Sequence, residues 1–290
     1  MKNLHNQKGV ALAIVVWFLA AMSLLVSGIV FQAKVDTRMA QLHAAKAKAV
    51  AAGDGAISLM LASVVSGGAQ QSNPGQLQQP MSFEVGPHDV TVSLVPVSGL
   101  IDLNSASPQM LASLFRVHGG LSEVDAQILG DTVVNWRATG GGRGGRPTRF
   151  SAIEDVLRVD GVNRGVLDGI RDSIAVGNSR RSAIDWSQAP QSVLDVLAKL
   201  NPDKALKQLD RIAAGQSNTN NNRLSSIGSS SRSGSLGSYR VDALVRVGDQ
   251  IWLRRRWAAS GTTGAGKLPW RFVRTEPPRV LQTMPLTKHT

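Results

Sequence analysis

Two glycine-rich stretches come close to phosphate-binding motifs, and each lacks a feature that this chemistry needs. The string GTTGAGKL at residues 261–268 nearly matches a P-loop. A P-loop needs Ser or Thr after the lysine to hold magnesium, and then a helix whose amides cradle the phosphate. Here a leucine and Pro269 follow, so we expect a hairpin loop. A GxGxxG pattern at residues 140–145 follows a predicted helix rather than a strand, and Pro147 would block the helix that this motif opens.

Other residue types that carry catalysis or metal binding are scattered along the chain. The histidines show no ligand spacing, and they are His5, His43, His88, His118 and His289. The aspartates do not follow the spacing of an EF-hand, and the sequence contains no nucleophile elbow. No pair of carboxylates has a spacing that suggests acid–base catalysis. The sequence therefore predicts a protein that is not an enzyme, and it assigns no catalytic residue, metal ligand or cofactor.

Three consecutive arginines, Arg254–Arg256, lie in a predicted strand and are the densest positive charge in the chain. A solvated outer face is the commonest role of such a run, and we expect that role here. Arg255 fits this expectation worst, because successive strand residues point to opposite faces and Arg255 alternates with Leu253 and Trp257.

The element that organises the rest of the chain is an uncharged apolar run at residues 10–31. As a helix, its roughly 22 residues would be about 33 Å long, which is enough to cross a bilayer. Lys2 and Lys8 precede the run and favour a cytoplasmic N-terminus, whereas Lys34 and Arg38 behind it weaken that signal. A cleaved secretory signal would have a shorter apolar region, of about 7–15 residues. An ordinary signal anchor fits the same pattern.

The helix is predicted to continue through residues 32–66. Its apolar stripe steps by three and four residues, and it includes Val35, Met39, Leu42, Ala49, Gly53, Ile57, Met60 and Val64. We expect the distal half of this helix to pack on the chain's own globular domain.

Two separated regions are predicted to build one antiparallel sheet. Residues 67–98 contain a loop and a hairpin that turns at Gly86-Pro87. Residues 238–276 alternate between apolar and polar side chains. In the first strand one face is formed by Tyr239, Val241, Ala243, Val245 and Val247. A turn at Gly248-Asp249 leads into a second strand, which pairs back through Ile251, Leu253 and Trp257. A last strand follows near residues 269–275. We expect residues 216–237, which are rich in Ser, Asn and Gly, to form a loop, and residues 277–290 to form a loose tail.

Residues 99–215 are predicted to form a helical insertion between the two parts of the sheet. Ser105 or Ser107 can cap a helix that is entered at Pro108, and Ser122 can cap a second helix. Together these helices form a helix-hairpin-helix unit, of the kind found in SAM-like domains.

A second hairpin is expected at residues 150–174. The string IDLNSASP at residues 101–108 is echoed by IDWSQAP at residues 184–190. The Asn and Asp side chains of these repeats are expected to cap helices and tie turns together. The fold class is therefore α+β, with a long N-terminal helix on an antiparallel sheet and a large helical insertion.

Length, charge and cysteine content limit the size of the core, the kinds of partner and the chemistry that the chain can have. The chain has 290 residues and a formal net charge of +12, so it can bury a core, and its basic balance suits an acidic surface, nucleic acid, anionic lipid or simply solubility. It has no cysteine, which excludes disulfides and thiol chemistry.

The order of these features resembles the K-type minor pseudopilin family of type II secretion (general secretion pathway protein K). A short basic leader at residues 1–9, then the apolar helix, is similar to a pilin N-terminus. The segment AVAAGDGAISLML, the DLNSA element at residues 102–106 and Asn135-Trp136-Arg137 resemble K-type segments at these positions. The resemblance implies that prepilin peptidase cuts between Gly9 and Val10 and methylates the new amine of Val10. The fifth mature residue is Ile14, where most pilins have Glu, and that absence is a feature of the K type.

The resemblance further implies that the protein functions in filament assembly rather than in catalysis. As a K-type subunit it would sit at the tip of the periplasmic pseudopilus and start its assembly with the I-, J- and H-type minor pseudopilins and the major pseudopilin. It would thereby support export of folded proteins across the outer membrane. Before assembly it would be a single-pass protein of the bacterial inner membrane, with a cytoplasmic N-terminus and a periplasmic head. The resemblance permits calcium on loops of the head, and no ligands are assigned.

A membrane-anchored helix-hairpin-helix protein of the competence type, which binds DNA, is the alternative. Basic charge favours it, as phosphate contacts require. DNA-binding hairpins usually have a tight Gly-x-Gly turn, whereas residues 118–123 are longer and lead into Glu123 and Asp125. We therefore expect no nucleic acid partner.

Overall fold

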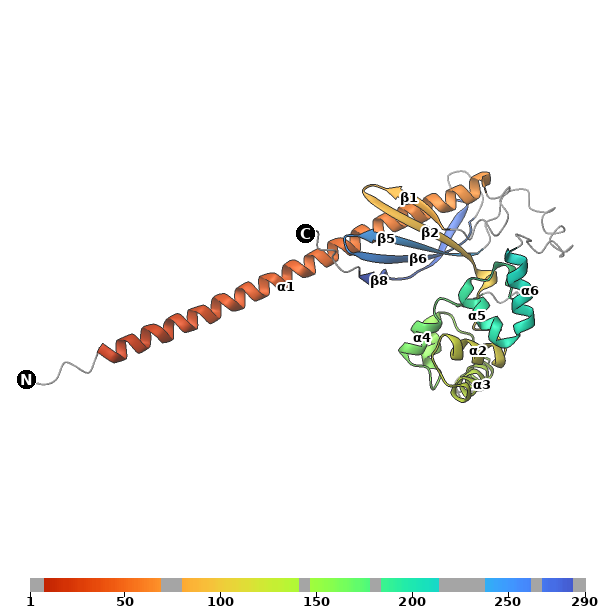
Figure 1. Cartoon of the computed structure of the whole chain (residues 1–290), viewed down its shortest axis with the longest axis horizontal. Helices are drawn as coiled ribbons and strands as arrows, with labels where there is room; N and C mark the ends of the chain where they lie inside the picture. Colours follow the sequence, from red (N-terminus) through yellow and green to blue (C-terminus); the bar gives the residue numbers. More distant parts are fainter. Residues whose placement is uncertain are drawn as a thin grey trace, which may run out of the picture.

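The structure, a computed structural model, describes residues 8–68, 80–140, 147–177, 184–213, 238–261 and 268–283 (Figure 1). The helices are α1 (Lys8–Ser63), α2 (Pro108–Val117), α3 (Glu123–Thr139), α4 (Arg164–Ile170), α5 (Gln191–Leu200) and α6 (Pro202–Ala213). Short turns of other helix types are η1 (Val64–Gly68), η2 (Val97–Gly99), η3 (Ile153–Arg158) and η4 (Trp186–Gln188). The strands are β1 (Met81–Val85), β2 (His88–Pro96), β3 (Ile101–Asp102), β4 (Ile174–Ala175), β5 (Tyr239–Val247), β6 (Gln250–Ser260), β7 (Trp270–Thr275) and β8 (Arg279–Thr283).

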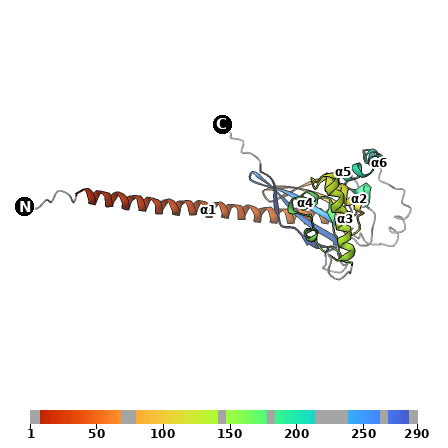
Figure 2. The ribbon, with the colours of Figure 1, turned by 90° about the horizontal axis from the view of Figure 1, so that it is seen from below.

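The helix α1 is one continuous rod whose two halves have different surroundings (Figures 1 and 2). Its distal half packs on the sheet through small and aliphatic residues on one face, namely Ala49, Ala52, Ala56, Ile57, Met60 and Leu61. Gly53 lies on that face, where a Cβ would come within 2.8 Å of the Cβ of Arg254, so only glycine fits this close approach. The predicted packing of the distal half is therefore confirmed.

The main sheet has the strand order β1-β2-β5-β6-β7, with β8 also paired to β6, and all of these pairs are antiparallel. The two predicted regions of the sheet meet where β2 pairs with β5. The register places Val245 of β5 opposite Trp252 of β6, and both pack against α1. Leu253 and Trp257 therefore lie on the opposite face of the sheet, and Trp257 belongs to the core of the insertion. The predicted α+β fold, with a long helix on an antiparallel sheet, is confirmed.

The insertion between β2 and β5 has its own hydrophobic core, which α2 to α5 build at the end of the molecule opposite the N-terminus (Figure 1). Ser107, and not Ser105, caps α2, because its hydroxyl accepts a hydrogen bond from the backbone N–H of Met110. Ser122 caps α3 in the same way through the N–H of Asp125. The two-residue strands β3 and β4 pair in parallel and tie the start of the insertion to the end of α4.

The tail was predicted to be loose, and part of it is a strand instead. Residues 279–283 form β8, which pairs with the first half of β6, while β7 pairs with the second half. The strand β6 is 11 residues long and β7 only 6, so the shorter strand leaves half of the β6 edge open for β8. The prolines that suggested a loose tail, Pro277 and Pro278, lie in the link between these strands.

Most of the two glycine-rich stretches, namely residues 141–146 and 262–267, lies outside the described residues, but the flanking elements are described. Gly261 and Leu268 connect the antiparallel neighbours β6 and β7, and residues 262–267 between them lie outside the described residues. A strand, not a helix, follows this connection. Gly140 ends α3 with a φ of 66°, the left-handed conformation that favours glycine at a helix C-terminus.

Candidate functional site: an exposed apolar rod and a buried arginine network

The N-terminal half of α1 is an apolar rod that nothing in the described structure covers. Every residue from Ala11 to Ala44 is exposed, over a length of about 50 Å. This helix is long and apolar enough to cross a membrane, judged by its length and composition. Such a surface is stable only in lipid or against other apolar helices, so the rod is the first candidate site.

The predicted processing and assembly residues lie in the first turns of this rod. Gly9 and Val10 are helical residues next to the start of α1 at Lys8. Ile14 follows one turn later and is 63% exposed. With Trp17 and Phe18 it lines a shallow apolar hollow on the helix surface. The structure thus places Ile14 on an uncovered face, where its side chain would meet lipid or a partner helix.

The DLNSA element and the W-R pair, which are far apart in sequence, contact each other. Arg137 donates to the carbonyl oxygens of Leu103 and Ala106, both at 2.8 Å. Asn104 exchanges two hydrogen bonds with the backbone of Phe150, at 3.0 and 2.8 Å. The ring of Phe150 stacks on Trp136, with 4.7 Å between the ring centroids. These motif residues therefore hold the turns of the insertion together, as predicted for the Asn and Asp side chains.

The first hairpin turn of the insertion uses its own backbone amides. His118 and Gly119 both donate to the carbonyl of Leu114, at 2.9 and 3.4 Å, and Leu121 donates to that of Phe115, at 3.3 Å. In a DNA-binding hairpin the turn amides would meet phosphate. Here the N–H groups of His118, Gly119 and Leu121 are engaged within the hairpin, which weighs against phosphate contacts from these three amides.

The three arginines of β6 are not a solvated face, and that expectation was wrong. Arg254 and Arg255 are only 8% and 3% exposed. Arg254 points to α1 and donates from Nε and Nη2 to the two carboxylate oxygens of Asp54, at 2.8 and 3.1 Å. Arg256 lies 3.4 Å from the same carboxylate and its guanidinium stacks on the ring of Phe272. The acidic residue of the AGDG string therefore fixes the sheet on the helix.

Arg255 points the other way, toward the insertion, and its charge is shared by two carboxylates. It donates from Nε and Nη2 to Asp242 at 2.6 and 2.9 Å, and from Nη1 to Asp172 at 2.6 Å. Arg240 donates to Asp242 at 3.1 Å and to the backbone oxygen of Asp172 at 2.6 Å. Arg279 of β8 reaches Asp172 at 2.8 Å. Asp172 belongs to the insertion, so these contacts join it to the sheet.

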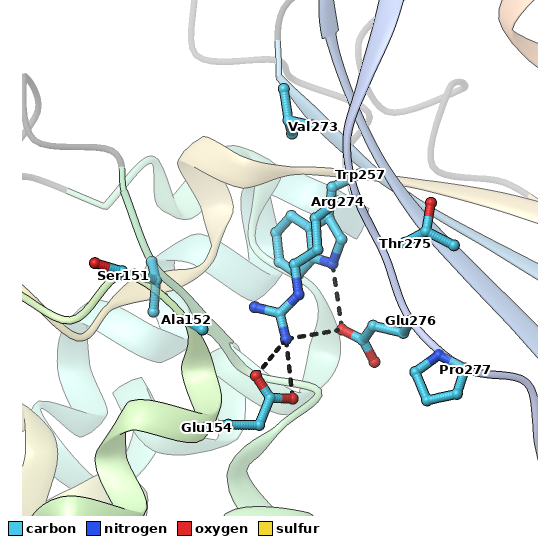
Figure 3. A pocket seen from close by; sticks show the side chains of 10 residues that line it. Ser151, Ala152, Glu154, Trp257, Val273, Arg274, Thr275, Glu276 and Pro277 are labelled. Atoms are coloured by element: carbon cyan, nitrogen blue, oxygen red, sulfur yellow. Dashed lines mark hydrogen bonds and ion pairs between the residues drawn. The ribbon is translucent and has the colours of Figure 1, made fainter.

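Glu276 extends this junction beside an open groove (Figure 3). Its carboxylate is almost fully buried; it accepts from Trp257 Nε1 at 3.3 Å and from Arg171 Nη1 at 3.4 Å. Arg171 also donates to Glu154 at 3.2 Å, and Arg274 donates to both oxygens of Glu154, at 3.0 and 2.8 Å. We call the whole set the arginine network: Arg171, Arg240, Arg255, Arg274 and Arg279 with Glu154, Asp172, Asp242 and Glu276.

The arginine network is the main feature that sequence reasoning missed, and its chemistry is structural. Each carboxylate in it faces at least one guanidinium, so no free acid or base is poised for proton transfer. Within the described residues, no group of three or more His, Asp or Glu side chains could hold a metal ion. Burial lowers the pKa of Arg240, and the carboxylate of Asp242 opposes that effect. The network can therefore fix the insertion on the sheet, and we assign it that role.

Asp172 gives this junction a predictable pH dependence. Partial burial raises the pKa of Asp172, but the guanidiniums of Arg255, Arg279 and Arg240 outweigh it, and the pKa lies below its usual range. A lowered carboxyl pKa stabilises the fold above the unfolded pKa of about 3.9, and the stabilisation is lost as the pH falls through the lower folded value. We expect Asp172→Asn to lower the free energy of unfolding by about 1 kcal/mol or less at pH 7, since the side chain is half exposed. Urea unfolding at pH 7 and pH 3 should show that difference shrinking; an equal difference at both pH values would contradict this.

Comparison with known proteins identifies a fold. No family model matches the sequence. A chain of the GspK-GspI-GspJ complex from the Type 2 Secretion System of enterotoxigenic Escherichia coli has a similar structure, with a TM-score of 0.50 and 13% identity over 86% of this chain and 100% of that chain. Because residues 97–238 make up about half of this chain, a match of that extent must include much of the insertion. At this identity the match shows a pilin-like fold.

Curated relatives match a smaller part of the chain. The endonuclease/exonuclease/phosphatase family domain-containing protein 1 of Homo sapiens is 31% identical over 114 residues, and that of Mus musculus is 32% identical over 114 residues. Each match covers 39% of this chain and spans only 17% of the relative's length.

Proposed function

We propose that this chain is a K-type minor pseudopilin, which sits at the tip of a type II secretion pseudopilus and starts its assembly. The observation that carries the proposal is an exposed apolar rod joined without a break to a pilin-like head that bears a large helical insertion. The similarity to a chain of the GspK-GspI-GspJ complex extends into that insertion and supports the K type over smaller subunits. The activity is assembly, and the chain is not an enzyme.

The rod supplies both the anchor and the assembly surface. Prepilin peptidase removes residues 1–9 and methylates the amine of Val10, and the mature helix stays in the inner membrane until it is extracted into the filament. The head lies in the periplasm and the N-terminus in the cytoplasm. Because lipid and neighbouring apolar helices are equally apolar, the rod can leave one for the other at little cost in free energy.

Ile14 explains why the subunit belongs at the end of the filament. In other pilin-like subunits a Glu at this position attracts the N-terminal amine of a neighbour, and such a buried charge needs its partner. An isoleucine cannot form that pair, and here it lies among Trp17 and Phe18 on an apolar face. The helical insertion suits the tip too, because its bulk would clash along a shaft.

The partners follow from this position. The I- and J-type minor pseudopilins are the subunits named with the K type in the similar structure. The H-type minor pseudopilin and the major pseudopilin lie further from the tip of the filament. Prepilin peptidase acts on the chain before assembly. Export of folded proteins through the outer membrane is the process served.

Ile14→Glu tests the tip position. The substitution places a charge in the apolar rod that costs about 2.5–3.5 kcal/mol at the centre of a membrane helix when it lacks a partner, and less toward the ends. We expect a clear loss of exoprotein secretion in the host, with the head still folded. Ile14→Leu is the control and should secrete normally; normal secretion by the Glu variant would contradict the tip position.

A pull-down of the full chain in non-ionic detergent tests the proposal itself. We expect the I- and J-type minor pseudopilins of the same host to copurify with it in stoichiometric amounts. A salt-dependent DNA-binding assay on the same sample tests the competence-type alternative. Micromolar binding to DNA without copurifying subunits would overturn the proposed function.

A further inference from the structure

An open groove separates β7, the last strand in the order of the main sheet, from the insertion, and Glu154, Arg274 and Glu276 of the arginine network form part of its lining. Its volume is about 490 Å³, and its lining includes Ser151 and Glu154 of the insertion, Val273 to Thr275 of β7, and Glu276 and Pro277 of the link that follows β7 (Figure 3). We propose that this groove binds an extended, acidic segment of a partner protein, which adds as a strand to the outer edge of β7.

The outer edge of β7 is free to pair. β7 is the last strand in the order of the main sheet, and no described strand pairs with its far side. The N–H of Gly261 donates to the carbonyl of Pro269 at 2.7 Å. Because antiparallel strands alternate between inward and outward groups, Trp270 and Phe272 then direct their N–H and C=O groups outward. Unpaired ladder groups of this kind are the template for strand addition.

A β-bulge in β7 exposes an apolar side chain beside that edge. Phe272 pairs with Ala258 and Arg274 with Trp257, so Val273 is an extra residue in β7. Such a bulge re-aims a side chain, and Val273 is 54% exposed and lines the groove. The buried Trp257 lies on the same groove wall. A partner segment of a few residues can therefore pair along Trp270–Phe272 and place one apolar side chain near Val273.

Two exposed arginines flank the groove, whose own lining contains the charged residues Glu154, Arg274 and Glu276. Arg271 of β7 and Arg149, two residues before Ser151, are exposed. The acids of the groove are already neutralised: Glu154 by Arg274 and Arg171, and Glu276 by its buried contacts. A segment with acidic side chains is thus attracted to this edge, and a basic one is repelled.

Labelled peptides provide the test, with the full chain in a non-ionic detergent. The probes are a fluorescent peptide of alternating Glu and Val, its Lys and Val counterpart, and a version of the acidic peptide with methylated backbone nitrogens. We expect the acidic peptide to bind about tenfold more tightly than the basic one, and its affinity to fall with added salt. The methylated peptide should not bind, because strand addition needs its N–H groups.

A pair of charge reversals locates the site. Arg271→Glu should weaken binding of the acidic peptide by about tenfold, since an attraction becomes a repulsion. The control Arg246→Glu reverses an exposed arginine at the far end of β5 and should change the affinity less than twofold. Hydrogen exchange should slow at Trp270 and Phe272 when the acidic peptide is bound, and not in β1.

Three outcomes would overturn the proposal. They are no saturable binding at millimolar peptide, equal affinities for the acidic and basic peptides, or equal losses in the two arginine variants. Binding of a second copy of the chain in place of peptide, seen as a dimer that Arg271→Glu dissociates, would also reject it. None of these outcomes depends on whether the chain assembles into a pseudopilus.

Discussion

Replacing Asp242 by Ala should lower the free energy of unfolding by about 3–5 kcal/mol, because it strips two buried guanidiniums of their shared carboxylate. Arg240 and Arg255 are only 4% and 3% exposed, and Asp242 accepts a hydrogen bond from the first and two from the second. Neither side chain can reach water without opening the junction between the sheet and the insertion. Urea unfolding of the full chain in detergent micelles, followed by tryptophan fluorescence, measures the loss.

Two controls separate this effect from a general loss of charge. Asp249→Ala removes an exposed acid from the turn between β5 and β6 and should change the free energy of unfolding by less than about 0.5 kcal/mol. The double substitution Asp242→Leu with Arg255→Met removes Asp242 together with one of its two guanidinium partners and should recover part of the loss, since an unpaired buried charge costs more than a missing pair. A loss below about 1 kcal/mol for Asp242→Ala would show that the arginine network does not hold the junction.

Replacing Gly9 by Ala, and more completely by Val, should stop the removal of residues 1–9. A glycine before the cut leaves the peptide bond open on all sides, whereas a Cβ, and still more a branched side chain, narrows the approach of a peptidase. Intact mass measurement of the protein purified from its host should then show the full leader and no methylated amine on Val10. Under the proposed function, in which only the mature chain enters the filament, secretion should fall in parallel.

Gly28 offers the matched control in the same helix. A Cβ at Gly28 meets no heavy atom within 4 Å, so Gly28→Ala should mature and secrete as the unaltered chain does. A protein that begins at Val10 in the Gly9→Val variant would contradict the processing role, as would an unaltered chain that begins at Met1.

Local patterns were sufficient to predict most of the fold. The apolar run, the stripe along the distal half of α1, the Gly86-Pro87 turn and the Ser caps of α2 and α3 each depend on neighbours within a few residues. The hairpin at Gly248-Asp249 even contained an unused signal. A two-residue turn sets the register, and that register places Asp242 opposite Arg255. Opposite charges facing across a ladder predict a pair rather than a solvated face.

The rest depends on contacts between distant segments, which no local pattern encodes. Asp172 lies 83 residues before Arg255, and Glu154 lies 120 residues before Arg274. The strand β8 forms because β7 is too short to cover β6, a fact that becomes visible only when three strands are placed together. The processing residues Gly9 and Val10 are different again, since their role was inferred from resemblance and their chemistry needs another protein.

The insertion also dictates an order of events during synthesis. When β2 leaves the ribosome, its partner β5 lies about 140 residues further along, and β8, which completes the pairing of β6, lies about 180 residues further along. Loop closure over such a distance is slow. The helical unit can therefore condense first, while the unfinished sheet waits with exposed apolar edges. A nascent head of this design gains from being tethered and shielded until β5 to β8 have been made.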